Sequence, residues 1–293
     1  MPRTHPTVQT VQTRVGPVPV RISRPGGAAG ADGPVVLAVH GLLLDGRLWD
    51  GVAAHLAAEM TVVMPDLPLG AHPEAVPERS QLTPPMLAGA LVDVLDALGH
   101  QQAVVLGNDT GGALTQIAVA TYPERFSAMV LTSCDALRHF PPPLLAWLPR
   151  AARLPGVARG VVQFFSLPAL FARPGWANLL SARGVDSELV ASWLGPARQN
   201  RQVLADTAAF LRTVAPSHTL QAAEAIRAFP RPIVLAWSRR DRIFPPSDAE
   251  TLAGMWPTAQ LHWIDDALTF SPLDQPGRVA DAVRVAVGAL AAR

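Results

Sequence analysis

A short polar turn at residues 107–112, with the sequence GNDTGG, carries the side chain best suited to chemistry. It lies between an apolar run and a helical pattern, and small residues on both flanks permit a sharp strand-to-helix turn. Asp109, in the middle of the turn, would then stand at the carboxyl end of a strand and at the N-terminus of a helix. A helix N-terminus favours negative charge, so we expect Asp109 to be ionised. The alternative is an aspartate that only caps the helix.

Short apolar runs alternate with helical patterns around this turn. This alternation predicts an α/β fold, with a mostly parallel central sheet flanked by helices. The expected strands are residues 8–14, 18–24, 34–40, 61–65, 102–106, 129–133, 232–237 and 260–264. The expected helices include residues 48–60, 111–122, 247–255 and 276–292, and one that starts after an N-cap at Thr83 and ends near Gly99.

The alternation stops between residues 138 and 230, where the sequence is helical, rich in Pro and Trp, and without clear strands. We therefore predict an α/β core made of residues 1–137 and 231–293, with residues 138–230 as an inserted all-helical cap. A lid over an active site is a natural use for such an insertion.

The turn and three further motifs resemble the α/β-hydrolase fold, in particular the group with an aspartate nucleophile that includes haloalkane dehalogenases and epoxide hydrolases. His40-Gly41 resembles the oxyanion loop of that group, and PDLP at residues 65–68 resembles its turn after the fourth strand. DRIFP at residues 241–245 resembles its acid motif, D-x-x-x-P. The resemblance extends over residues 8–292 and implies an enzyme, although fold alone says less about the reaction.

The resemblance implies a role for each matching residue. Asp109 takes the position of the nucleophile, whose attack on an electrophilic carbon gives a covalent ester. The backbone N–H groups of Leu42 and Thr110 would form the oxyanion hole. Asp241 takes the position of the triad acid. Asp135, at the end of the sixth strand, lies where some haloalkane dehalogenases keep that acid instead.

Thr269 stands where the family has its histidine base. Its flanks match the family pattern, with Phe270 next and DQP at residues 274–276, so the register is secure. A threonine hydroxyl cannot act as a general base near neutral pH, so an ester on an aspartate nucleophile would not be hydrolysed in the usual way. His72 and His139 are the candidates for a replacement base, because both are expected on loops at the carboxyl edge of the sheet.

The residues that define two subgroups are missing. Haloalkane dehalogenases hold the halide with N–H donors that include a Trp after the nucleophile, whereas this chain has Thr110 there. Epoxide hydrolases of this fold use cap tyrosines, and the single tyrosine here, Tyr122, lies outside the predicted cap. Cap tryptophans that could supply an indole N–H are Trp147, Trp176 and Trp193.

The predicted pocket is apolar, with Leu43, Phe140, Trp147 and Phe164 among its lining, so we expect a hydrophobic small molecule as substrate. The 293 residues include 24 basic side chains, all of them arginine, which excludes Schiff-base chemistry and a lysine-anchored cofactor. The net charge is +1, with no basic block that would suggest nucleic acid or a membrane as partner. A single cysteine and no leader-like segment suggest a cytoplasmic protein. We expect no cofactor and no metal, in a monomer or homodimer.

Three interpretations remain open. The first is a hydrolase-superfamily enzyme that acts on a hydrophobic small molecule through Asp109 and Asp241 with a substitute base. The second is an enzyme that performs no hydrolysis, a cyclase, isomerase or lyase in which Asp109 is a general acid or base. The third is a non-catalytic ligand-binding protein on a disabled hydrolase scaffold.

Overall fold

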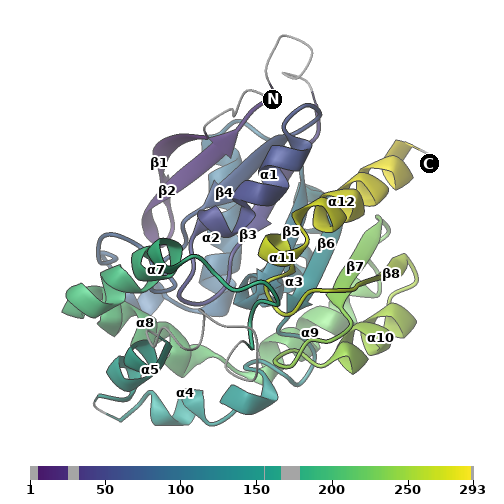
Figure 1. Ribbon diagram of the computed structural model, residues 1–293. Coiled ribbons are helices and arrows are strands. Elements are labelled where there is room, and N and C mark those ends of the chain that lie inside the picture. The colour runs from purple at the N-terminus through teal and green to yellow at the C-terminus, as the bar shows by residue number, and fades with distance from the viewer. Residues whose placement is uncertain (1–5, 26–32, 155, 166–178, 292–293) are drawn as a thin grey trace.

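The computed structural model describes residues 6–25, 33–154, 156–165 and 179–291, and its centre is an eight-stranded sheet (Figure 1). In spatial order the strands are β1 (Thr7–Thr13), β2 (Gly16–Ser23), β4 (Thr61–Pro65), β3 (Val35–Val39), β5 (Ala103–Asp109), β6 (Phe126–Cys134), β7 (Ile233–Ser238) and β8 (Ala259–Ile264). The pairings of β1 with β2 and of β2 with β4 are antiparallel, and the other five are parallel. The predicted α/β class is confirmed.

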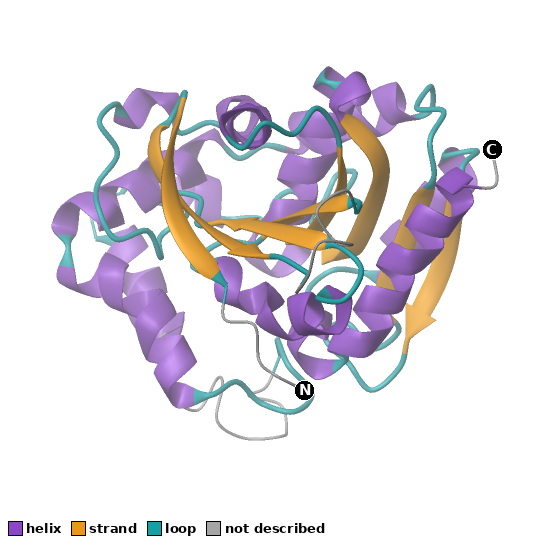
Figure 2. Cartoon of the chain, turned by 90° about the horizontal axis from the view of Figure 1, so that it is seen from above, coloured by secondary structure: helices purple, strands orange, loops and turns teal. Residues whose placement is uncertain are grey.

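Helices cover both faces of the sheet, as the view from above shows (Figure 2). One face carries α1 (Asp50–Leu56) and α12 (Pro276–Ala291), which pack against each other. The other carries α2 (Pro84–Ala97), α3 (Thr110–Thr121), α9 (Pro216–Ile226) and α10 (Pro246–Met255). Because both faces are covered, every residue of β4 and of β7 is buried, which explains their continuous apolar sequences.

The ends of α2 follow the signals in its sequence. The hydroxyl of Thr83 accepts a hydrogen bond from the N–H of Met86, and Pro84 and Pro85 occupy the first turn. After the helix, Gly99 has φ of +76°, the left-handed conformation that glycine adopts without strain. The predicted cap residue and the predicted terminating glycine are both confirmed.

The chain between β6 and β7 is helical wherever the structure describes it, apart from loops and one isolated β-bridge. Its elements are η5 (Pro143–Leu145), α4 (Leu148–Ala151), α5 (Val157–Phe165), α7 (Ser187–Gln199) and α8 (Arg201–Thr213), followed by α9. Helices α4, α5, α7 and α8 gather at the left and lower left of Figure 1, whereas α9 packs on α3 beside the sheet. The packing therefore groups α9 with the core, although it lies within the range 138–230 predicted as cap.

Two predicted elements differ in extent. The helix expected over residues 48–60 is a 3₁₀ turn, η2 (Gly46–Trp49), followed by the short α1. Helix α1 ends at Leu56, whose carbonyl oxygen accepts from the N–H groups of Glu59 and Met60 in a turn. The strand expected to end at Leu106 continues to Asp109. Its last residues are poor strand formers, but Gly107 pairs with both neighbouring strands and Asp109 pairs with Cys134.

Two short 3₁₀ turns, η3 (Arg79–Gln81) and η4 (Pro123–Arg125), and the short helix α11 (Ser271–Asp274) complete the elements. In the described ranges, no helix is both long enough and apolar enough to cross a membrane.

Candidate active site

Asp109 ends β5 and is the N-cap of α3, with φ of +55°. A non-glycine residue at positive φ is uncommon and strained, and such strain concentrates at functional sites. The flanking glycines make this turn possible: a Cβ on Gly111 would lie 2.2 Å from the carbonyl oxygen of Val39, and one on Gly112 would lie 2.2 Å from Cβ of Cys134. Only glycine fits at these two positions, because the turn packs directly against the Val39 backbone on one side and Cys134 on the other. This packing holds the Asp109 turn in place.

The carboxylate of Asp109 lies between two backbone donors. Its Oδ1 accepts a hydrogen bond from the N–H of Leu42 at 3.1 Å and another from the N–H of Thr110. These are the two groups that the sequence predicts for the oxyanion hole. Burial raises the pKa of Asp109, and the two N–H groups act against that rise because they favour the ionised form. The close approach requires Gly41, where a Cβ would meet Oδ1 at 2.3 Å.

His40 shapes the oxyanion loop. Its ring is fully buried, with Nε2 accepting from the N–H of Leu67 at 2.9 Å and Nδ1 lying 2.8 Å from the carbonyl oxygen of Gly41. Nε2 therefore carries no proton, and Nδ1 donates to Gly41. Burial lowers the pKa of His40 to about 4, which agrees with a neutral ring. The ring ties this loop to the turn after β4 and leaves no nitrogen for a substrate.

Asp135 follows β6 and is buried beside the Asp109 turn. Its Oδ2 accepts a hydrogen bond from the hydroxyl of Thr110 at 3.1 Å, and its backbone carbonyl accepts from Nε2 of Gln116. Its Oδ1 is buried without a hydrogen-bond partner among the described residues. Burial, followed by the charge of Asp109, raises the pKa of Asp135 well above its usual range, against the hydrogen bond from the Thr110 hydroxyl.

Asp241 and Thr269 form the second cluster of the site. Asp241 Oδ1 accepts hydrogen bonds from the N–H groups of Ile243 at 2.7 Å and Phe244 at 2.8 Å, and from the hydroxyl of Thr269 at 3.1 Å. The structure thus brings Thr269 to the triad acid, where the base of the resembled family would stand. Burial raises the pKa of Asp241 to about 6 against these hydrogen bonds.

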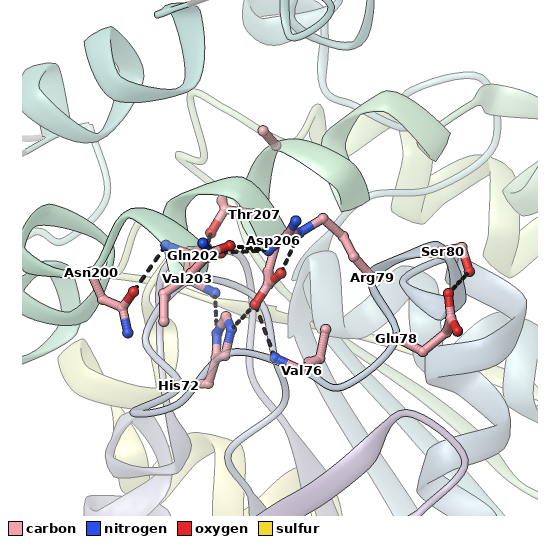
Figure 3. Close-up of polar contacts among 12 residues, drawn as sticks. His72, Val76, Glu78, Arg79, Ser80, Asn200, Gln202, Val203, Asp206 and Thr207 are labelled. Atoms are coloured by element: carbon pink, nitrogen blue, oxygen red, sulfur yellow. Dashed lines mark hydrogen bonds and ion pairs between the residues drawn. The ribbon is translucent and has the colours of Figure 1, made fainter.

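His72 does not line the cavity beside Asp109; it joins the core to the cap (Figure 3). Its Nδ1 accepts from the N–H of Gly70 at 3.2 Å, so Nε2 carries the proton and donates to Asp206 Oδ2 at 3.3 Å. The buried carboxylate of Asp206, on α8, also accepts from the N–H of Val76 and from Nε of Arg79 at 2.6 Å. Both nitrogens of His72 are therefore used, and this candidate base is structural.

His139 is also placed away from Asp109. Its Nδ1 lies 2.7 Å from Oδ2 of Asp248, at the start of α10, and the ring is partly exposed. His218, at the start of α9, has its Nε2 3.2 Å from the carbonyl oxygen of Thr213. None of the histidines in the described chain hydrogen-bonds to Asp109 or lines its cavity.

A cavity of about 390 Å³ lies between core and cap, with Asp109, Thr110 and Asp135 at its floor. All four side chains that the sequence analysis places in the pocket line it: Leu43, Phe140, Trp147 and Phe164. The remaining lining is apolar: Leu42, Leu44, Pro141, Pro142, Leu144, Leu145, Leu148, Leu179, Leu180, Val190, Trp193, Leu194, Phe210, Leu211, Val214, Ile243, Phe244 and Phe270. A ligand in this cavity would therefore meet two carboxyl groups and one hydroxyl in an otherwise hydrocarbon environment.

Residues 34–276 match the alpha/beta hydrolase fold family. The chain belongs to this family. An uncharacterized protein of Mycobacterium tuberculosis is 24% identical over 264 residues, which cover 86% of this chain and 74% of the relative. A 2-hydroxymuconate semialdehyde hydrolase of Pseudomonas putida is 31% identical over 177 residues, 58% of this chain and 57% of the relative.

Solved structures share the fold of this alpha/beta hydrolase. A haloalkane dehalogenase from Bradyrhizobium elkani superposes with a TM-score of 0.78 at 18% identity, covering 98% of this chain and 100% of that one. An esterase from Thermogutta terrifontis superposes with a TM-score of 0.68 at 21% identity, covering 97% and 99%. Together with the family match and the hydrolase-named relatives, this makes the chain an enzyme of the hydrolase superfamily.

The described tryptophan and tyrosine side chains that could have served as halide or epoxide donors are hydrogen-bonded to other groups of the protein. The indole N–H of Trp193 donates to Oδ1 of Asp45 at 2.9 Å, and that of Trp147 donates to the carbonyl oxygen of Leu144 at 3.1 Å. Trp176 lies outside the described residues, as do residues 166–178 generally. Tyr122 ends α3 and its hydroxyl accepts from Arg14 at 3.0 Å. Neither Trp147 nor Trp193 therefore has a free N–H for a halide, and Tyr122 does not line the cavity.

Two buried amides that the sequence analysis missed hold the site together. Nδ2 of Asn108 donates to the carbonyl oxygens of Thr269 at 2.8 Å and Ser133 at 3.0 Å, and to the hydroxyl of Thr132. Gln116 on α3 holds the backbone of Asp135 in the same way. Asn108 adjoins the nucleophile position, but its partners are far away in the chain, so only the fold reveals its role.

Proposed function

We propose that this enzyme acts on an apolar small molecule and that Asp109 serves as proton acceptor in a reaction without hydrolysis: an isomerisation, a cyclisation or an elimination. The observation that carries the proposal is the setting of the Asp109 carboxylate. Its Oδ1 is held by the N–H groups of Leu42 and Thr110, so Oδ2 is the oxygen available to a ligand. No histidine of the described chain hydrogen-bonds to it.

The cavity supports a proton-transfer role. A carboxylate among hydrocarbon side chains is poorly solvated, and burial accordingly raises the pKa of Asp109, which makes it a stronger base than an exposed aspartate. Fixed donors on Oδ1 keep the group oriented while Oδ2 takes up a proton. The nearly uniform apolar lining, in a volume of about 390 Å³, favours a compact hydrophobic substrate.

The threonine at position 269, where the resembled family has its histidine base, argues against ordinary hydrolysis. Hydrolysis of an ester on Asp109 requires a group that activates water, and the hydroxyl of Thr269 cannot do this near neutral pH. That hydroxyl donates to Asp241. His72 and His139 are bonded to Asp206 and Asp248. Internal proton transfer needs no activated water, so the loss of the imidazole leaves such a reaction intact.

A covalent reaction at Asp109 is the second candidate, because the strained turn presents its carboxylate as a nucleophile-bearing turn would. An alkyl halide or an epoxide would then alkylate Oδ2. Without a base, the resulting ester would persist, so the protein would gain the mass of the reagent once and stop.

One experiment separates these candidates. Wild type and Asp109→Asn are incubated in D₂O with 3-cyclohexenone, and in H₂¹⁸O with 1-bromohexane, styrene oxide and 4-nitrophenyl hexanoate. The proposal expects deuterium to enter the ketone, in wild type alone, faster than in buffer. A mass adduct on Asp109 without ketone exchange would favour the covalent candidate. Sustained release of ¹⁸O-labelled product would overturn the proposal in favour of hydrolysis, and an inert protein would overturn both in favour of ligand binding.

A further inference from the structure

The floor of the cavity holds a second carboxyl group, and it differs from Asp109 in its surroundings. Asp109 has two backbone N–H groups on one oxygen. The carboxyl group of Asp135 receives a single hydrogen bond, from the hydroxyl of Thr110 to Oδ2, while its Oδ1 is buried and has no partner among the residues described. Both residues line the same cavity. A buried carboxyl oxygen without a partner is costly when charged, whereas a protonated one can donate a hydrogen bond to a ligand.

We propose that Asp135 is a second catalytic carboxyl group, a proton donor beside Asp109, and that the pair acts on a neutral apolar ketone or enone. This inference rests on the proposed function of Asp109 and adds the substrate class and the acid. Two carboxyl groups in unlike hydrogen-bonding environments can serve as base and acid without any imidazole.

The charged groups around Asp135 agree with this assignment. Asp109 and Asp248 both disfavour a further negative charge on Asp135. His139 pairs with Asp248 and not with Asp135. The neighbouring Cys134 is buried, and burial raises the pKa of its thiol, so it adds no charge. The hydroxyl of Thr110 is the one group that favours the charged form of Asp135, and no ion pair joins this carboxyl to a cation in the described ranges.

The reaction balances within the substrate and these two groups. A proton on the carbon next to the carbonyl passes to Oδ2 of Asp109, and the electron pair of that C–H bond becomes the C=C bond of an enol. The carbonyl π electrons move to oxygen, which takes the proton of Asp135. Asp109 then returns its proton to the far carbon of the dienol, the O–H proton returns to Asp135, and a β,γ-unsaturated ketone has become its conjugated isomer. No water, oxidant or reductant is consumed.

Two substitutions of Asp135 separate catalysis from structure. Asp135→Asn keeps the shape and an N–H donor but cannot release a proton, and Asp135→Leu keeps the volume but removes both. We measure isomerisation of 3-cyclohexenone by the ultraviolet absorbance of its conjugated product, across pH, in wild type, both Asp135 variants and Asp109→Asn. Thermal unfolding checks that each variant folds.

The inference expects a rate loss of about 100-fold or more for Asp135→Asn and a larger one for Asp135→Leu, mainly in kcat. It also expects the high-pH decline of the wild-type profile to disappear in Asp135→Asn. If both folded Asp135 variants keep the wild-type rate and profile while Asp109→Asn is inactive, Asp135 is not the acid but the function of Asp109 stands. If wild type does not isomerise the ketone, the inference and the proposed function both fall.

Discussion

The hydroxyl of Thr269 donates a hydrogen bond to Oδ1 of Asp241 at 3.1 Å, and the two residues lie 28 positions apart in the sequence. Asp241 follows β7 and Thr269 follows β8, two adjacent parallel strands whose carboxyl ends meet at the same edge of the sheet. The residue next to the predicted triad acid is therefore a threonine, and no imidazole is bonded to this acid in the described residues. A hydroxyl at this point stabilises the carboxylate and does not relay a proton.

Thr269→His should restore a base next to this acid. Under the covalent candidate, an ester formed on Asp109 by styrene oxide should be hydrolysed in this variant, so that the adduct seen by intact mass decays and product accumulates. General base catalysis contributes about 100-fold or more. Because Thr269 is wholly buried, the larger ring should also cost about 1–3 kcal/mol of stability. Thr269→Asn is the control for size, and equal adduct decay in both variants would contradict the prediction.

Asp241 should make stability depend on pH in a specific window. Its pKa in the folded protein is raised to about 6 by burial, above its ordinary 3.8, so the folded state holds the proton more tightly between these values. Its contribution to the free energy of unfolding should therefore fall as pH rises through this window, by about 3 kcal/mol, and stay constant above it.

Urea unfolding of wild type and Asp241→Asn at several pH values measures this contribution as a difference. The comparison matters because Asp66, whose pKa burial also raises to about 6, titrates in the same window in both proteins. Parallel stability curves for the two proteins would show that Asp241 does not titrate as expected.

Asp206 should be the main polar link between cap and core. Its carboxylate is fully buried and accepts hydrogen bonds from His72, Val76 and Arg79 (Figure 3). Asp206→Ala leaves the buried His72 ring and the Val76 N–H without an acceptor, so we expect a loss of about 2–4 kcal/mol. Arg79→Ala removes only a partly exposed partner and should cost about 1 kcal/mol or less. Chemical denaturation compares the two variants, and equal losses would contradict this ranking.

Gly41→Ala should disable the site without unfolding the chain. The added Cβ would lie within 2.5 Å of three atoms of the Asp109 side chain, so the carboxylate must leave its two N–H donors. We expect activity to fall by about 100-fold or more, as when donors of an anion site are lost. Gly254→Ala is the matched control, since a Cβ there meets nothing within 4 Å and lies in α10. Substrate turnover and thermal unfolding of both variants test this, and full activity in Gly41→Ala would refute it.

The sequence was informative wherever one local pattern decided the structure. The glycines around Asp109, the Thr83 cap and the buried runs of β4 and β7 each have a local cause, so the elements could be predicted from neighbouring residues. The Asp109 turn and the position of Thr269 could also be predicted, because recognisable residues flank them: the glycines at 107, 111 and 112, and Phe270 with DQP at 274–276. These features yield the α/β class, the two carboxyl groups of the cavity and the four side chains predicted for its lining.

Partnerships across the chain could not be predicted in the same way. His72 and His139 lie on loops, as expected, but their carboxylate partners are 134 and 109 residues away, on helices α8 and α10. No local sequence pattern predicts that Asp206 and Asp248 would hydrogen-bond to these two histidines. Asn108 shows the same limit, because its bond to Thr269 spans 161 residues.

The carboxylate of Asp109 lies in the oxyanion hole that the sequence predicts, where a substrate oxygen would be expected. Both donors of that position, the N–H groups of Leu42 and Thr110, already point at Oδ1. A bound ester would find no unfilled anion site for its carbonyl oxygen, and its tetrahedral intermediate would go unstabilised. Asp109 thus fills the predicted oxyanion hole with its own carboxylate, and we expect little esterase activity for that reason. A serine at position 109 has its hydroxyl oxygen where the carboxyl carbon of aspartate stands, so it is too short to reach the two N–H groups as Oδ1 does and would leave them free.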